Sequence, residues 1–111
     1  MRAVYIIPEV GKNPRLTLMK SYLVVGLSEE FLRVINDAGE PILYPRSCFE
    51  FSEGEIPIDW VREEFPDGEF HIEPAETASI GFYERFFDGD QDAVDAFEAL
   101  RQHLEEDSSN L

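Results

Sequence analysis

An α+β fold is predicted by this sequence: a small five-stranded β-barrel over residues 1–51, followed by an extension over residues 52–111 that ends in helix. Short apolar segments separated by tight turns fill the first part, with no helical pattern between them, which favours a small barrel. Near the C-terminus, apolar residues recur at spacings of three and four, which is typical of a helix with one buried face. The length of 111 residues and the supply of nine Phe, four Tyr and one Trp indicate a single domain with a hydrophobic core.

Five short strands are expected in the barrel. The first covers residues 3–7 and ends at Pro8, because proline cannot donate a backbone hydrogen bond. After a loop of turn-forming residues over 8–20, the other strands are expected at residues 21–28, 31–36, 41–44 and 48–51, with a single 3₁₀ turn at 45–47. Gly39 supplies the positive φ that the turn between the third and fourth strands requires.

The extension is expected to contain one further short strand and one or two C-terminal helices. A helical turn capped by Asp59 is expected to reach Phe65, and the alternation over residues 68–72 favours one more strand. Residues 81–87 bring four aromatic side chains together on a short helix. The last helix is expected at about residues 91–105, where one apolar face packs on the core.

The order of strands and turns in the first half follows a recognisable pattern. A strand over residues 21–27 is followed by a strand that ends in Asn-Asp-Ala-Gly-Glu at 36–40, a strand that ends in Tyr44-Pro45, a short turn and the strand 49–51. This block resembles the SH3-like barrels of small bacterial proteins. The resemblance covers about half of the chain and implies a fold rather than a function, because this barrel hosts many unrelated roles. The chain departs from a bare barrel in its acidic extension, and barrels extended in this way are similar to uncharacterised and toxin-neutralising immunity proteins.

The negative charge lies almost entirely in the second half of the chain. Residues 1–50 contain six acidic and six basic side chains, whereas residues 51–111 contain eighteen acidic and three basic ones and therefore carry the whole net charge of −15. Like charges at this density repel one another, but they accelerate encounter with a cationic surface. The asymmetry indicates that a binding partner would be basic and would face the second half.

No cofactor, metal or catalytic site is predicted. The single cysteine, Cys48, and the two histidines, His71 and His103, lack the spacing of a metal site or a catalytic pair. The acidic segment 88–92 lacks the Gly and Glu that a calcium loop places at its sixth and twelfth positions. Phosphate-binding glycine loops are absent, and the acidity disfavours direct binding of nucleic acid. The lone cysteine, the lack of a signal peptide and the lack of a long apolar segment predict a cytoplasmic protein without membrane association.

A non-enzymatic protein-binding module is the function that this charge pattern favours. The acidic face is expected to block a basic partner, in the most concrete case a cognate toxin whose substrate cleft is positive, as an immunity or antitoxin protein would. Electrostatic steering would make the association fast and sensitive to salt. The residues expected to contact the partner are Asp67, Glu69, Asp88, Asp92, Asp95 and Glu98.

Alternatives to this hypothesis stay open. SH3-like barrels often bind peptides, so an aromatic groove formed by Tyr22, Tyr44 and Trp60 would make the chain a peptide-binding adaptor. An enzyme of unrecognised type is the second alternative, although no catalytic constellation supports it. Acidity also serves solubility alone in many proteins. The neutral first half and the acidic second half are compatible with a head-to-tail homodimer.

Overall fold

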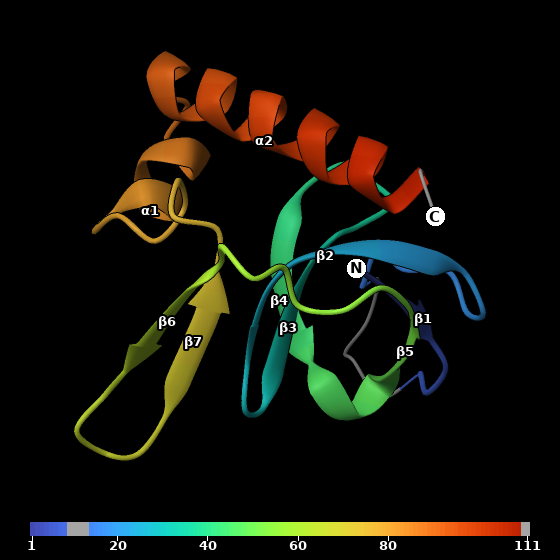
Figure 1. Ribbon diagram of the computed structural model, residues 1–111. Coiled ribbons are helices and arrows are strands. Elements are labelled where there is room, and N and C mark those ends of the chain that lie inside the picture. The colour runs from blue at the N-terminus through green and yellow to red at the C-terminus, as the bar shows by residue number, and fades with distance from the viewer. Residues whose placement is uncertain (9–13, 110–111) are drawn as a thin grey trace.

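The computed structural model describes residues 1–8 and 14–109 and shows an α+β fold, in which two C-terminal helices lie on one side of an antiparallel sheet (Figure 1). Within these residues the sheet has seven strands. The strands are β1 (Arg2–Tyr5), β2 (Ser21–Ser28), β3 (Phe31–Ile35), β4 (Pro41–Pro45), β5 (Phe49–Glu53), β6 (Val61–Glu64) and β7 (Phe70–Glu73). A 3₁₀ turn, Arg46–Cys48, connects β4 to β5, and the helices are α1 (Phe82–Phe87) and α2 (Gln91–Ser109).

Strand β2 is the centre of the sheet, because it pairs with three other strands. Its first half pairs with β1, its last two residues pair with β7, and β3 lies along its opposite edge. The main strand order is β4-β3-β2-β1-β5, and β6 joins the sheet through β7. Within the described residues β4 and β5 end this order without pairing to each other, so the sheet is not closed into the predicted barrel.

Most elements form where the sequence places them, and one prediction is wrong. The helical turn expected between Asp59 and Phe65 is replaced by β6, which pairs with β7 along its full length. The four residues of β6 are all exposed, so the segment has no buried face that would favour a helix or a strand. Its pairing with β7 therefore determines its conformation. The strand expected at 68–72 is β7, the short aromatic helix is α1, and the last helix is longer than expected and reaches Ser109.

A β-bulge in β2 divides its side chains between two cores. Val24 pairs with Val34 while Gly26 pairs with Arg33, so one extra residue stands on β2 between these pairs. Val24 and Leu27 therefore both belong to the first core, although residues three apart on a regular strand would point to opposite faces. Val25 belongs to the second core, beneath the helices. The bulge thus determines which residues of β2 face α1 and α2.

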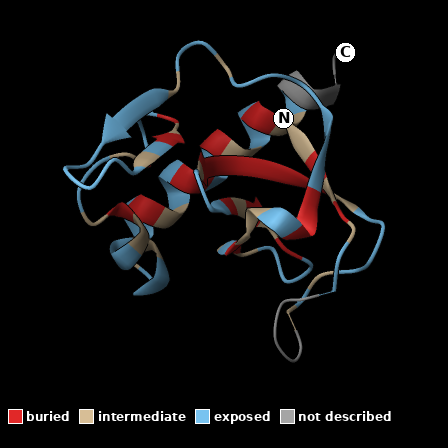
Figure 2. Cartoon of the chain, turned by 90° about the horizontal axis from the view of Figure 1, so that it is seen from below, coloured by how far each residue is buried: buried red, intermediate tan, exposed pale blue. Residues whose placement is uncertain are grey.

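The two cores lie on opposite faces of the sheet. The first is built from inward residues of β1 to β5 together with Ile72 of β7 and Cys48 of the 3₁₀ turn, and Leu32, Val34 and Cys48 are almost fully buried in it. The second joins Leu23 and Val25 of β2 to the buried side of α2. Trp60 packs against both cores. In Figure 2 the buried residues form a band along β2 and a stripe along α2, whereas the β6–β7 hairpin is mostly exposed.

Candidate functional site

The six acidic residues predicted to bind a partner lie in two separate places. Asp67 and Glu69 lie in the turn of the β6–β7 hairpin, which extends away from α2 in Figure 1. Asp88 lies between the helices, and the other three lie on the exposed side of α2. All six are exposed, as a binding role requires, but the fold does not gather them into a single patch.

Only part of the acidic side of α2 is neutralised within the chain. Glu98 and Glu105 both form ion pairs with Arg101, at 2.7 and 3.2 Å between nitrogen and oxygen. The hydrogen bond to Glu98 is the main reason why the pKa of Arg101 is raised. Asp95 accepts a hydrogen bond of 2.7 Å from the Gln91 amide, which brings no compensating charge. The N-terminal half of α2 therefore retains its negative charge.

The three aromatic residues predicted to form an exposed groove, Tyr22, Tyr44 and Trp60, are buried or half-buried. Tyr22 and Tyr44 are only 3% and 6% exposed, and Trp60 is half-buried. The Tyr44 hydroxyl donates to the carbonyl oxygen of Pro14 at 2.6 Å, and the Tyr22 hydroxyl donates to Asp37 at 2.9 Å. Their rings complete the first core while their hydroxyls fix neighbouring loops, a combination that suits the tyrosine side chain. Tyr22 and Tyr44 are therefore buried in the first core, contrary to the exposure that a peptide-binding groove would require.

The helices cover only part of one sheet face, and the uncovered part forms a pocket of about 550 Å³. Strand pairing aligns Leu43 of β4, Arg33 of β3 and Gly26 of β2 in one row across its floor, and Glu73 of β7 lies beside Gly26 at the end of this row. A neighbouring row contains Phe31 of β3 and the paired residues Ser28 and His71 of β2 and β7. The segment 77–84, which leads into α1, forms the opposite wall.

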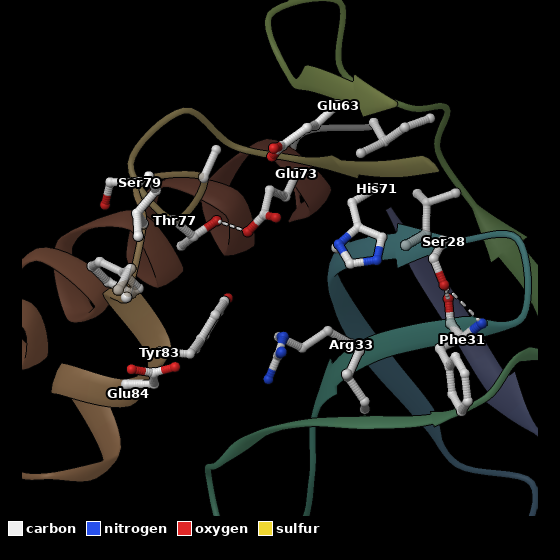
Figure 3. Close-up of a pocket in the computed structure, with 18 of the residues that line it drawn as sticks. Ser28, Phe31, Arg33, Glu63, His71, Glu73, Thr77, Ser79, Tyr83 and Glu84 are labelled. Atoms are coloured by element: carbon white, nitrogen blue, oxygen red, sulfur yellow. Dashed lines mark hydrogen bonds between the residues drawn. The ribbon is translucent and has the colours of Figure 1, made fainter. Parts of the chain in front are cut away.

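Arg33 and Tyr83 form the central contact of this pocket. The guanidinium carbon lies 3.8 Å from the centre of the Tyr83 ring, a stacked cation–π arrangement that joins the sheet to α1 (Figure 3). Burial is the main cause of a lowered pKa for Arg33, although this group keeps its charge in proteins. One nitrogen, Nη1, donates to the carbonyl oxygen of Pro41 at 2.8 Å. The stack holds the plane of the guanidinium at the floor of the pocket.

The hydroxyl of Tyr83 has an unusual environment. Its oxygen is buried and neither donates nor accepts a hydrogen bond of normal geometry among the described residues. Burial raises the pKa of Tyr83 to about 12, while the nearby positive charge of Arg33 and the Thr77 hydroxyl oppose the rise. The phenol is therefore neutral at physiological pH. A buried hydroxyl without a partner costs stability, which makes Tyr83 a candidate for a functional residue.

Three carboxylates surround this contact. Glu73 accepts a hydrogen bond of 2.7 Å from the Thr77 hydroxyl, which fixes its position where the floor of the pocket meets the wall (Figure 3). Glu63 and Glu84 line the same pocket and are exposed. The acids outnumber Arg33, so the pocket as a whole favours a positively charged or dipolar occupant.

Cys48 and His71 lie in different surroundings. Cys48 is a buried free thiol in the first core, whereas His71 is exposed, lines the pocket and packs against Phe65 at 4.9 Å between ring centres. Across the described ranges, no group of three potential metal-ligating side chains comes together. Neither described helix is both long and apolar enough to span a membrane.

Sequence reasoning did not identify the pocket, although one signal for it was visible. The alternation in β3 places Arg33 between Phe31 and Ile35 on one face, and a cation between two apolar residues on a strand face indicates a special environment. The other members come from β2, β7 and α1, and only strand pairing reveals that they are neighbours. In comparisons with known proteins, no family model, no curated protein and no solved structure matches the chain.

Proposed function

We propose that this chain is a non-enzymatic protein-binding module of the immunity or antitoxin type, whose acidic second half blocks a basic partner. The observation that carries the proposal is the exposed N-terminal half of α2. Asp92 and Asp95 lie on its surface, Asp88 precedes it, and no ion pair neutralises any of the three within the described residues. Carboxylates on such a surface replace the phosphates that a positive cleft would otherwise bind.

An SH3-like core is part of this proposal. The continuous order β4-β3-β2-β1-β5 and the 3₁₀ turn between β4 and β5 support it, since both follow the pattern that the first half of the sequence shares with such barrels. The β6–β7 hairpin and the two helices would then be additions to that core. A rigid core with an acidic helix on its surface suits blocking by shape and charge, and requires no catalytic group.

The Glu98–Arg101 pair suggests how specificity would arise on the same surface. Exposed ion pairs contribute little, about 0–1 kcal/mol, so the pair is easily exchanged for one with a partner's cation. The unpaired acids nearer the helix start would provide steering, which is screened over about 8 Å at physiological ionic strength. Association would therefore slow markedly as salt increases.

Affinity capture from the source lysate, with matched charge variants as bait, tests this proposal. One variant removes four charges at the proposed surface through Asp88→Asn, Asp92→Asn, Asp95→Asn and Glu98→Gln. The control removes four charges from exposed acids elsewhere through Glu50→Gln, Glu53→Gln, Glu55→Gln and Glu76→Gln. Both variants carry the same net charge, so they separate a specific surface from general acidity.

We expect wild type and control to retain one basic protein at low salt, and the surface variant to lose it. Circular dichroism checks that α2 persists, because acids in the first turn of a helix stabilise it by about 0.3–1 kcal/mol each. Once the partner is purified, binding should weaken at least tenfold between low and moderate salt. Equal retention by the two variants, or affinity independent of salt, contradicts the proposal.

A further inference from the structure

The floor of the pocket presents two opposite charges, Arg33 and Glu73, which attract each other without forming an ion pair. Arg33 and Glu73 flank Gly26, and a Cβ built on this glycine would lie 3.7 Å and 3.6 Å from their Cβ atoms. Neither side chain forms an ion pair with any described residue. Because Gly26 has no side chain, the space between the guanidinium and the carboxylate stays open.

The Arg33 side of the floor is suited to a carboxylate. A guanidinium has five N–H donors, and the structure commits one to the carbonyl oxygen of Pro41. Stacking on Tyr83 orients the planar group, which lowers the entropy lost when it binds a planar carboxylate. An arginine of this kind binds a carboxylate through two parallel hydrogen bonds.

The Glu73 side of the pocket is suited to a cation. Its carboxylate is held by Thr77 and keeps acceptor capacity, since an ionised carboxylate has about four acceptor positions. Glu63 and Glu84 add negative charge around the opening. Gly26 lies between the two charged side chains and leaves room there for an aliphatic chain, while Phe31 and Leu43, both exposed, add apolar surface on the Arg33 side of the pocket.

We propose that this pocket binds a basic α-amino acid, either free or as the C-terminal residue of a polypeptide, with its carboxylate on Arg33 and its side-chain cation toward Glu73. The net positive charge of such a molecule matches a lining in which carboxylates outnumber guanidinium. The volume of about 550 Å³ falls within the usual range of small-molecule sites, about 300–1,000 Å³. This assignment concerns a different surface from the outer side of α2 and does not depend on the proposed docking of a basic protein.

Titration of the full chain, followed by two-dimensional ¹H–¹⁵N NMR, tests the assignment with four probes. L-arginine has both charged ends, argininamide lacks the carboxylate, and L-citrulline lacks the side-chain cation but keeps the α-ammonium group. N-acetyl-L-arginine keeps the carboxylate and the guanidinium but blocks the α-amino group, as a chain end does. We expect saturable shifts at the amides of Gly26, Arg33, Glu73 and Tyr83 with L-arginine, and binding about tenfold weaker or more with argininamide and citrulline.

The N-acetyl probe distinguishes the two sources of the ligand. Binding equal to that of L-arginine assigns the site to a C-terminal basic residue, and weaker binding assigns it to the free amino acid. Either result supports the recognition of a carboxylate and a cation together. Equal binding of argininamide and L-arginine would instead show that simple attraction of cations explains the shifts, and would overturn the proposal.

Two variants tie the shifts to this pocket. Glu73→Gln keeps the shape and the acceptor for Thr77 but removes the charge, and Gly26→Val fills the floor without changing any charge. Each should weaken L-arginine binding about tenfold, whereas Glu50→Gln on β5 should leave it unchanged. Contacts of 3.6–3.8 Å around the added Cβ are ordinary, so Gly26→Ala serves as a folded substitute if the valine variant is unstable. Unchanged binding in the Glu73 and Gly26 variants, or no saturable shift with any probe, excludes the assignment.

Discussion

Replacing Tyr83 by Phe should stabilise the protein, contrary to the usual effect of changing a buried residue. The hydroxyl oxygen of Tyr83 is buried and has no hydrogen-bond partner within the described residues. Such an unsatisfied group costs about 1–3 kcal/mol of desolvation, and removing it recovers part of this cost. The ring, its 3.8 Å stack with Arg33 and its contacts with Phe86 and Phe97 would remain. We therefore expect the free energy of unfolding to increase by about 1 kcal/mol.

Tyr44→Phe is the matched control for this experiment. The Tyr44 hydroxyl donates a hydrogen bond to the carbonyl oxygen of Pro14 and accepts one from the Asn36 amide. Its removal would leave these two buried or half-buried groups without that hydrogen bond. This variant should lose about 1–3 kcal/mol. Urea unfolding with an unchanged m-value measures both differences. A loss of 1 kcal/mol or more in Tyr83→Phe would show that the Tyr83 hydroxyl is hydrogen-bonded, and the reasoning would fail.

Alkaline pH provides a second readout for Tyr83. Its pKa is raised to about 12 mainly by burial, whereas an unfolded tyrosine titrates near 10. Between these values the unfolded chain loses the proton and the folded chain keeps it, so stability falls as pH rises through this window. Tyr83→Phe should remove the share of this pH-dependent destabilisation that comes from Tyr83. The difference in unfolding free energy between the variant and wild type should therefore grow above about pH 10.

Two further substitutions test the loop anchor and the second core. Asp37→Asn should destabilise the protein at neutral pH, because hydrogen bonds from Lys20, Thr17 and Tyr22 lower the pKa of this carboxyl. The difference in unfolding free energy between Asp37→Asn and wild type, measured by urea unfolding, should vanish as the pH falls below about 3.9, the unfolded pKa of an aspartate, and through the lower folded pKa of Asp37. A difference that persists at lower pH would show that the charge of Asp37 is not the cause. Phe97→Ala should cost about 3–5 kcal/mol, since Phe97 is 1% exposed beneath α2, and thermal unfolding that shows under 1 kcal/mol would contradict this packing.

Local patterns were sufficient for most of the secondary structure. Gly39, with φ of 76°, forms the turn after β3 that its sequence context predicts, and the spacing of Phe97, Leu100 and Leu104 identified the buried side of α2. The same reasoning failed at β6, where an exposed segment has no periodic apolar face and takes its conformation from pairing with β7. It also failed for Tyr22 and Tyr44, because a tyrosine looks the same in sequence whether its ring is buried or exposed.

By itself, the sequence determined the α+β composition, the positions of most strands and helices, and the concentration of charge in the second half. These properties depend on neighbouring residues, whose turn preferences and apolar spacing can be read along the chain. Only the tertiary structure decided the open sheet and the pocket, because both depend on which strands pair and in what register. The bulge in β2 sets that register and brings Gly26, Arg33 and Glu73 side by side, although Glu73 is far along the chain from the other two.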